Sequence, residues 1–289
     1  MTIEVERTGG ESVTNWSPPG PAILFVPADR PERYAKAAER ADAVIIDLED
    51  AVRPENRDAA REALINNPID PNITMVRINP AGTGDHLKDL KALAQTDYRV
   101  VMLAKAESAE QLLPVGYQVV ALVETPLGAT KADQIAAAPN CIGLMWGAED
   151  LIAAMGGRSS RFTAGEENTG RYRDVALQVR GMVRLACAGH GRFAVDSVHI
   201  DIADTEGLRL EALDAVNLGY EATACIHPSQ VDIVRAAYSP TDDEISWARE
   251  VLDAAAANVG GVFRVKGQMI DSPLLGQAEA IMRRAPQAD

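Results

Sequence analysis

The chain has few cysteines, and their arrangement excludes several kinds of site. Among its 289 residues there are three cysteines, Cys141, Cys187 and Cys225, which form no CxxC pair and no Cys/His metal pattern. An odd, sparse set of cysteines in apolar surroundings indicates reduced thiols in a protein core. We therefore predict a cytoplasmic protein.

Basic residues are scarce relative to acidic ones. Lys and Arg number 28 against 42 Asp and Glu, which gives a formal net charge of −14 and a pI near 4.8. Binders of nucleic acid or anionic membranes need a basic face, so we predict no nucleic acid and no membrane as a partner. A local basic pocket for a phosphorylated or carboxylate ligand stays compatible with this balance.

Long apolar runs and several widespread motifs are also missing. No apolar run reaches transmembrane length, and residues 1–20, whose polar stretch ends at Pro18 and Pro19, indicate a flexible lead-in and no signal peptide. There is no GxGxxG turn after the first predicted strand, no GxSxG and no P-loop. These absences argue against a Rossmann dinucleotide site, a serine hydrolase and ATP hydrolysis, respectively.

From Pro21 onward, short apolar runs alternate with Ala-rich segments of helical spacing. The runs predict the strands Ala22–Val26, Ala43–Asp47, Thr74–Ile78, Val100–Leu103, Val119–Val123, Gly143–Trp146, Ser197–Ile200 and Ala222–Cys225. The intervening segments predict the helices Arg33–Ala41, Arg57–Asn66, Asp85–Leu93, Ala109–Leu113, Lys131–Ala138, Arg171–Ala188, Thr205–Leu218 and Ser229–Ala237. Eight such units in series predict a closed (β/α)8 TIM barrel, with an open doubly wound sheet as the alternative.

The tail exceeds what a barrel needs. We expect the barrel to span residues 21–238 and a C-terminal helical extension or lid to span residues 239–289. Pro240 and the acids that follow it predict a helix over Ser239–Ala257, and a short extended piece and a last helix come after it. The extension would cap the barrel or cross to a neighbouring subunit.

Acidic residues follow two successive predicted strands in the stretch Val119–Asp150. Glu124 comes directly after the first strand, and Glu149 and Asp150 come just after the second. The carboxyl ends of parallel strands point into a common mouth, and two hard oxygen ligands there suit Mg²⁺. A turn or helix N-cap is the structural alternative for each acid taken alone.

Other strand ends also carry charge, and some of these residues have a structural explanation. Arg77 ends the third strand and Lys105 follows the fourth. Barrel interiors hold ion pairs, such as Arg77 with an acid or Lys105 with Glu49. The polar, glycine-rich segment Gly156–Gly170 follows the paired acids, either as a loop that folds over ligand or as a surface insertion.

A set of motifs in order along the chain resembles a known family. These motifs are FVPADRPERYAKA, VIIDLEDAV, VRINP, VETPLGA, GAEDL, IHPSQ and GQMIDSP. Together they resemble the HpcH/HpaI aldolase and citrate lyase β-subunit family, in particular its stand-alone citrate lyase β-like branch, which acts on acyl-CoA thioesters. The resemblance runs from about Ala22 to the last helix. It implies a (β/α)8 barrel that forms a homotrimer or a dimer of trimers.

The resemblance also implies roles for particular residues around the metal. Glu124 and Asp150 would hold Mg²⁺, which agrees with the choice made from the strand ends. Arg77 would contact the 2-oxo-acid part of the substrate. The backbone of the Gly-Ala-Glu turn would hold the substrate carboxylate, through Gly147, Ala148 and Glu149.

Residues further from the metal gain roles from the same resemblance. Arg30, Arg33 and Lys36 would face the substrate mouth and the CoA phosphates. Asp271 in the MIDSP motif would reach the site of the next subunit as a general acid/base, with a helix N-cap before Pro273 as the alternative. One motif departs from the family, which has a proline where this chain has Ala104, before Lys105.

These implications predict a Mg²⁺-dependent carbon–carbon lyase. It would cleave a 3-hydroxyacyl-CoA, such as citramalyl-CoA or malyl-CoA, reversibly into a 2-oxo acid and an acyl-CoA. Three alternatives stay open: a malyl-CoA thioesterase or malate-synthase-like activity, a CoA-independent class II aldolase, and a carrier-dependent citrate lyase subunit.

Overall fold

The computed structural model describes residues 16–258 and 262–285. Within them the chain divides into two compact units between Val234 and Arg235, inside the helix α10 (Val231–Tyr238). The predicted border between barrel and extension, at residues 238 and 239, coincides with the end of this helix. Residues 1–15, most of the predicted lead-in, lie outside the described residues.

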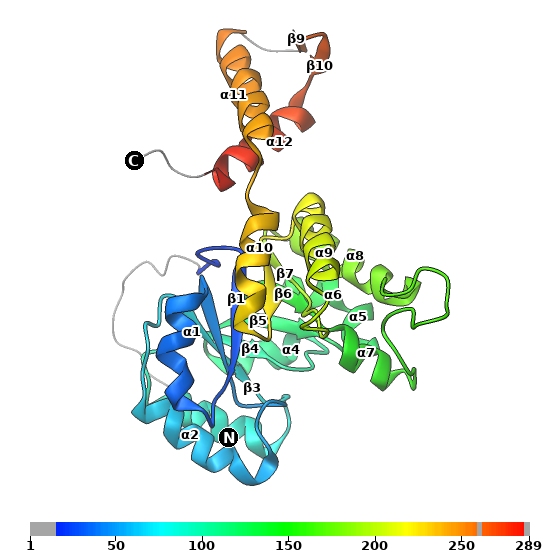
Figure 1. The fold of residues 1–289 in the computed structure, drawn as a ribbon. Coiled ribbons are helices and arrows are strands. Elements are labelled where there is room, and N and C mark those ends of the chain that lie inside the picture. Colours follow the sequence, from blue (N-terminus) through cyan, green and yellow to red (C-terminus); the bar gives the residue numbers. More distant parts are fainter. Residues whose placement is uncertain (1–15, 259–261, 286–289) are drawn as a thin grey trace. The chain divides into compact units, whose positions relative to one another are not determined.

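The first unit is a closed barrel of eight parallel strands, so the predicted (β/α)8 architecture is confirmed (Figure 1). Each strand pairs with the next along the chain, and β8 pairs with β1. The strands are β1 (Ala22–Pro27), β2 (Ala43–Asp47), β3 (Thr74–Ile78), β4 (Val100–Leu103), β5 (Gln118–Val123), β6 (Cys141–Trp146), β7 (Phe193–Asp196) and β8 (Ala222–Cys225).

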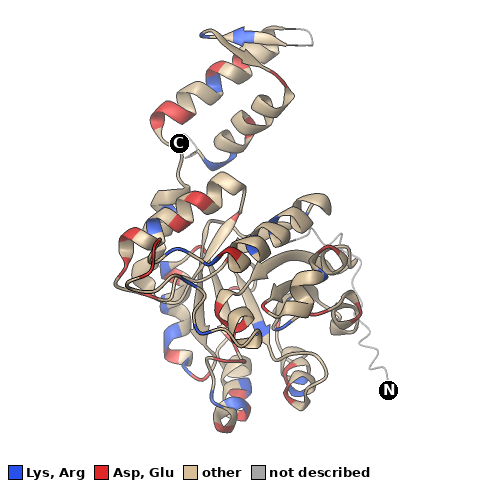
Figure 2. Ribbon diagram, turned by 90° about the vertical axis from the view of Figure 1, so that its right-hand side faces the viewer, with Lys and Arg blue, Asp and Glu red and all other residues tan. Residues whose placement is uncertain are grey.

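Helices surround this barrel, and charged residues lie mainly on them and on the connecting loops (Figure 2). Besides α10, they are α1 (Tyr34–Arg40), α2 (Arg57–Asn66), α3 (Gly84–Leu93), α4 (Ala109–Leu112), α5 (Pro126–Thr130), α6 (Ala132–Ala136), α7 (Ala148–Ala154), α8 (Asp174–Gly189) and α9 (Thr205–Leu218). The extents of α2 and α9 match the prediction, whereas α7 was not predicted. No helix in the described ranges is both long and apolar enough to cross a bilayer.

Apolar side chains from alternate strand positions fill the barrel interior, among them Ile45, Met102 and Leu122. At the amino ends of the strands, Trp16 packs edge-on against Phe193 with 5.7 Å between ring centroids. The Trp16 indole N–H also donates to the Asn72 carbonyl oxygen at 2.6 Å. The end of the predicted lead-in therefore closes the bottom of the barrel, opposite the carboxyl ends of the strands.

The seventh strand was predicted wrongly as Ser197–Ile200. The observed β7 lies four residues earlier, is fully buried, and pairs with both β6 and β8. It ends at Asp196, whose carboxylate accepts hydrogen bonds from the Trp146 indole N–H at 2.6 Å and from the buried Arg180 guanidinium. The polar–apolar alternation of Ser197–Ile200 imitates a strand, but these residues form the loop that follows β7.

The second unit has its own small core. It contains α11 (Asp242–Ala257), the antiparallel hairpin of β9 (Phe263–Val265) and β10 (Gln268–Ile270), and α12 (Ser272–Arg284). Val251, Ile270 and Ala278 are buried together in it. The predicted short extended piece is thus a hairpin, and the predicted last helix is α12.

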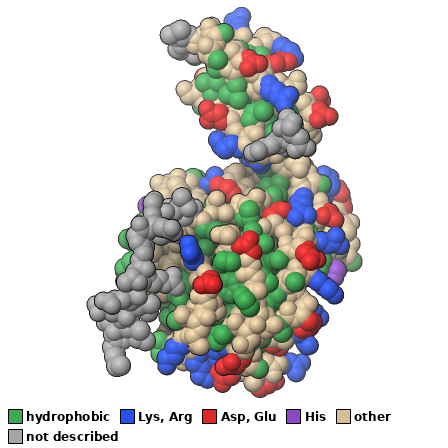
Figure 3. Space-filling model, turned by 90° about the vertical axis from the view of Figure 1, so that its left-hand side faces the viewer, with side chains coloured by type: hydrophobic (Ala, Val, Ile, Leu, Met, Phe, Trp, Pro, Cys, Tyr) green, Lys and Arg blue, Asp and Glu red, His purple; other side chains and the backbone are tan. Residues whose placement is uncertain are grey.

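The described surface of the barrel unit carries side chains of both charges, and the cysteines lie in the interior. On the face of the barrel unit in Figure 3, basic and acidic side chains are interspersed around apolar ones in the described part of the surface. The three cysteines are buried and free, and burial raises the pKa of the Cys141 thiol to about 11. They are core thiols, as predicted.

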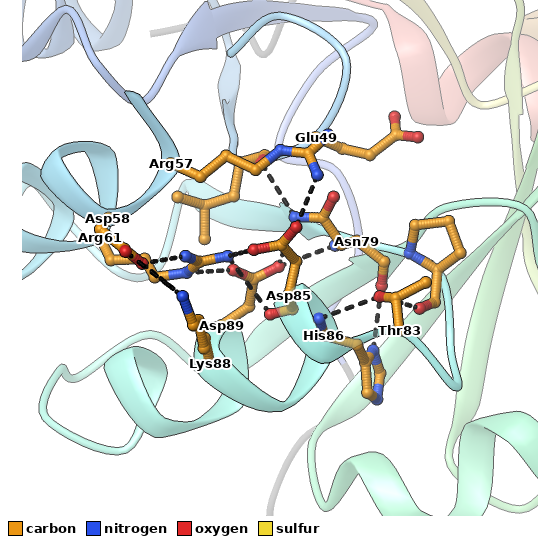
Figure 4. Close-up of polar contacts among 12 residues, drawn as sticks. Glu49, Arg57, Asp58, Arg61, Asn79, Thr83, Asp85, His86, Lys88 and Asp89 are labelled. Carbon is orange, nitrogen blue, oxygen red and sulfur yellow. Dashed lines mark hydrogen bonds and ion pairs between the residues drawn. The ribbon is translucent and has the colours of Figure 1, made fainter. Parts of the chain in front are cut away.

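A buried polar network fixes the carboxyl ends of β2 and β3 (Figure 4). Arg61 on α2 donates to Asp89 on α3, with 2.7 Å from Nε to Oδ1, and both side chains are almost fully buried. The other Asp89 oxygen accepts from the backbone N–H of Asn79 at 2.9 Å and from its side-chain amide at 2.8 Å. That amide also donates to the Leu48 carbonyl oxygen at 3.0 Å, which ties the end of β3 to the end of β2.

Replacing Asp89 with Ala tests this network. We expect Asp89→Ala to lower the free energy of unfolding by about 1–3 kcal/mol for each buried donor that loses its acceptor, namely Arg61 Nε–H and the two N–H donors of Asn79. Arg61 keeps Asp58 and Asp85 as partners. Urea unfolding followed by circular dichroism measures the change. The control Arg209→Ala breaks an exposed pair with Glu206 and should leave the urea midpoint unchanged. Equal midpoints for all three proteins would contradict a stabilising role.

Candidate active site

A cavity of about 180 Å³ opens at the carboxyl ends of the strands. Phe25, Leu122 and Met145 supply apolar wall. The polar side chains that line it are Asp47, Arg77, Glu124, Glu149, Asp150 and Ser197. This is the end of an α/β barrel where ligand sites are built.

Arg77 is a fixed cation in the wall of this cavity. Its Nε donates to Asp47 Oδ1 at 2.7 Å, its Nη1 lies 3.3 Å from Glu49 Oε2, and its guanidinium lies 4.9 Å from the centre of the Phe25 ring. Burial alone would lower the pKa of Arg77, but the neighbouring carboxylates, Asp47 first, raise it. The predicted ion pair of Arg77 with an acid is present, and it leaves part of the guanidinium fork for a ligand.

Glu124 is buried directly after β5 and is held from two sides. Its Oε1 accepts the backbone N–H of Lys105 at 3.0 Å. Its Oε2 lies so close to Gly147 that a Cβ at position 147 would approach it to 2.8 Å, which explains the glycine. Burial, and then the charge of Asp150, raises the pKa of Glu124 to about 8.

Asp150 lies in the first turn of α7 and shares a cation with Glu124. The Lys105 ammonium lies 3.4 Å from Asp150 Oδ1 and 3.9 Å from Glu124 Oε1. The two carboxylates therefore converge on one cationic position, which fits a hard divalent ion. Among the described residues no group of three or more His, Cys, Asp or Glu side chains is placed to hold a metal ion. The protein would therefore supply two carboxylates, and water or substrate oxygens would fill the other ligand positions.

In the Gly-Ala-Glu turn before Asp150, some of the backbone N–H groups already donate hydrogen bonds within the protein. The Gly147 N–H donates to the Val123 carbonyl oxygen at 3.0 Å, and the Ala148 N–H lies 3.4 Å from the Ser197 hydroxyl oxygen. The Glu149 side chain accepts the Ser160 hydroxyl at 2.5 Å. A bound carboxylate would therefore meet the first-turn amides of α7 more readily than the Gly147 amide.

The segment Gly156–Gly170 lies beside the site and is tied to it. Besides the Ser160–Glu149 contact, Arg161 pairs with Glu211 on α9 and stacks on the Tyr172 ring at 3.7 Å. Tyr172 in turn packs edge-on against Trp146 at the end of β6, with 5.1 Å between centroids. The loop is thus held by several side chains next to the cavity mouth.

Three predicted basic residues lie on the segment that follows β1, outside the cavity wall. Arg30, Arg33 and Lys36 are exposed. Arg30 lies 4.0 Å from Asp29, and Arg33 lies 3.9 Å from Glu32, so each meets an acid next to it in the sequence. Their predicted contact with CoA stays a prediction.

Asp271 belongs to the second unit, where it immediately precedes α12. It occupies the N-cap position, but its side chain makes no capping hydrogen bond. The structural alternative of a hydrogen-bonded N-cap is therefore not realised. The predicted role of Asp271 in a neighbouring subunit stays a prediction.

Two polar residues that line the cavity, Asp47 and Ser197, were not predicted as part of the site. Asp47 was noted at a strand end but was not assigned a function, although it positions Arg77. Ser197 was hidden because the seventh strand was misplaced over it. The signal for Asp47 is an Asp as the last residue of a buried strand, because the parallel register places it directly beside Arg77.

Comparisons with known proteins agree with this geometry. A sequence model of the HpcH/HpaI aldolase/citrate lyase family matches residues 22–228. The chain belongs to this family. A citrate lyase subunit beta-like protein of Mycobacterium tuberculosis is 54% identical to it over 93% of this chain and 97% of the relative. The family resemblance expected from the motifs is therefore confirmed.

Two further family members bear on the chemistry. The L-malyl-CoA/beta-methylmalyl-CoA lyase of Cereibacter sphaeroides is 31% identical, over 93% of this chain and 96% of that protein. The crystal structure of CitE from M. tuberculosis, in complex with magnesium, acetoacetate and coenzyme A, has a TM-score of 0.85 and 53% identity, covering 92% of this chain and 97% of that one. The family member described here is thus a lyase.

The raised pKa of Glu124 makes the stability of the metal-free protein depend on pH. Between its ordinary pKa of 4.5 and about 8, the unfolded chain ionises Glu124 while the folded chain keeps the proton. This residue's contribution to stability therefore falls as pH rises from about 5 to about 8. We expect Glu124→Gln to flatten the decline of the unfolding free energy over that range, measured by urea unfolding in EDTA.

The control for this measurement is Glu206→Gln, which removes an exposed carboxylate on α9. Its stability should follow the pH dependence of the wild type. If Glu124→Gln also followed the wild type, Glu124 would not hold a proton in the folded chain at neutral pH.

Proposed function

We propose that the chain is a magnesium-dependent carbon–carbon lyase acting on a 3-hydroxyacyl-CoA such as citramalyl-CoA or malyl-CoA. It would release a 2-oxo acid, pyruvate or glyoxylate, and acetyl-CoA or another acyl-CoA, reversibly. The observation that carries this proposal is the convergence of Glu124 and Asp150 on one cationic position, in the same cavity wall as Arg77. The magnesium, acetoacetate and coenzyme A bound to the CitE relative support it.

Glu124 and Asp150 would hold the metal. When bound, Mg²⁺ would supply Lewis acidity that lowers the pKa of a substrate hydroxyl and stabilises a forming carbonyl. Arg77, held by Asp47, would stabilise negative charge on the same substrate oxygen without having to reorganise. The first-turn amides of α7, at Ala148 and Glu149, would orient the substrate carboxylate.

The bond changes need one base, for the proton of the substrate hydroxyl, and one acid, for the enolate. A base takes the hydroxyl proton, the carbon–carbon bond breaks, and its electron pair passes to the thioester as an enolate. Asp271 would give that enolate a proton, or remove the α-proton in the condensing direction. The Asp271 carboxyl is suited to this role because its side chain makes no capping hydrogen bond to α12.

We also infer the setting in which these residues work. Asp271 would act in the cavity of a neighbouring subunit, in a homotrimer or a dimer of trimers. The exposed cations after β1, Arg30, Arg33 and Lys36, would meet the CoA phosphates. The three buried free thiols are in keeping with a cytoplasmic enzyme.

A product assay tests the reaction. The purified chain is incubated with racemic citramalyl-CoA or malyl-CoA, in Mg²⁺ and in EDTA, and the products are separated by chromatography. We expect Mg²⁺-dependent release of acetyl-CoA with pyruvate or glyoxylate. Free CoA together with intact hydroxy acid would instead indicate a thioesterase. No turnover of either thioester would favour the CoA-independent aldolase or the carrier-dependent subunit.

Matched variants connect the reaction to the site. Glu124→Gln and Asp150→Asn should each lower kcat/KM about a hundredfold or more, because each removes a metal ligand. Glu206→Gln, an equal charge change on the exposed face of α9, should retain wild-type activity. Full activity in the Glu124→Gln, Asp150→Asn double variant would contradict the metal assignment.

A further inference from the structure

Lys105 occupies an unusual position among acidic groups of the cavity mouth. Its ammonium donates to Glu49, lies 3.1 Å from Asp50 Oδ2, and lies within 4 Å of both Glu124 and Asp150. The Lys105 ammonium thus lies within 4 Å of four carboxyl groups, which follow three different strands. The mechanism described above does not use it.

The backbone at Lys105 is held in a conformation that its side chain disfavours. Its φ of +51° lies in the left-handed region, which non-glycine residues rarely adopt. In this conformation its own N–H donates to Glu124 Oε1 at 3.0 Å. The backbone N–H and the ammonium of Lys105 therefore both contact Glu124. Backbone strain of this kind is common at functional sites.

The residue before Lys105 fits the same arrangement. The Ala104 N–H donates to the Ile78 carbonyl oxygen at 3.3 Å, at the end of β3. A proline at position 104 has no N–H and could not form this bond. Where the family has a proline, this chain therefore has a residue whose N–H forms a hydrogen bond that proline cannot form.

The contacts of the Lys105 ammonium fall into two sets. It is hydrogen-bonded to Glu49 and Asp50 on the β2 side of the mouth. Toward Glu124 and Asp150 it makes longer ion pairs, at 3.9 and 3.4 Å, without a hydrogen bond. It can therefore give up the second set while keeping the first.

We propose that Lys105 is a built-in counter-ion that occupies the position between Glu124 and Asp150 when no metal is bound and yields this position to Mg²⁺, withdrawing onto Glu49 and Asp50. The inference rests on the proposed metal site at Glu124 and Asp150. Lys105 thereby weakens Mg²⁺ binding, since the divalent ion must displace one positive charge. It also keeps the paired carboxylates together before the metal arrives.

Isothermal titration of the full chain with MgCl₂ tests this role. Lys105→Asn removes the charge and introduces a residue that tolerates a positive φ. We expect it to bind Mg²⁺ about tenfold or more tightly than the wild type, because a nearby like charge is gone. Lys105→Arg keeps the charge and should stay within a few-fold of the wild type. Lys88→Asn makes the same charge change in an exposed pair with Asp58 and should leave affinity unchanged.

A thermal measurement supplies a second readout. The rise in Tm between EDTA and a fixed, near-saturating Mg²⁺ concentration should be larger for Lys105→Asn than for the wild type or Lys88→Asn, because at a fixed ligand concentration the stabilisation grows with the logarithm of the affinity. If the Mg²⁺ affinity and the rise in Tm of Lys105→Asn were equal to or below those of the wild type, the counter-ion role would be overturned.

The variant Glu124→Gln separates this inference from the proposed function. If the wild type binds Mg²⁺, Glu124→Gln does not, and Lys105→Asn matches the wild type, then Lys105 alone has been misassigned. If the wild type does not bind Mg²⁺, or Glu124→Gln binds it equally well, then the metal site itself is wrong and the counter-ion role falls with it.

Discussion

Charge compensation at the carboxyl ends of β2 to β6 is the constraint on which the site depends. Acids from several strand ends meet in one small mouth, and two of them, Glu49 and Glu124, are buried enough for burial to raise their pKa values. Arg77 and Lys105 supply the balancing cations. Each lies where two or more carboxylates meet. The cavity is thus arranged so that two cations hold its acidic side chains close together.

The barrel makes this arrangement possible because it is closed and stiff. Parallel register places Asp47 directly beside Arg77, so the ion pair is set by the sheet itself. Behind it, Asp89 and Asn79 tie the ends of β2 and β3 together away from the solvent. On the other side of the mouth, Gly147 lets the β6–α7 turn approach Glu124 closely. Catalytic geometry of this kind gains from such preorganisation, because the donors need not move during reaction.

Much of the architecture followed from the sequence because each strand is a short apolar run between helical segments. The pairing of Glu124 with Asp150 was predictable too, since residues that follow successive parallel strands share one end of the barrel. The seventh strand was misplaced because the polar–apolar alternation of Ser197–Ile200 outweighed the fully buried run before it. The ion pair of Lys105 with Glu49 was predicted and is present, but the approach of Lys105 to Glu124 and Asp150 was not predicted, since it depends on a positive φ that an Ala-Lys-Ala sequence does not signal.

Anomalous X-ray scattering from crystals soaked with MnCl₂ tests the central claim most directly, because Mn²⁺ accepts the same oxygen ligands as Mg²⁺. The account predicts an anomalous peak bound by the carboxylates of Glu124 and Asp150, beside Arg77, with the Lys105 ammonium on Glu49 and Asp50. A cavity without a peak at saturating Mn²⁺, or a peak coordinated by neither Glu124 nor Asp150, would contradict it.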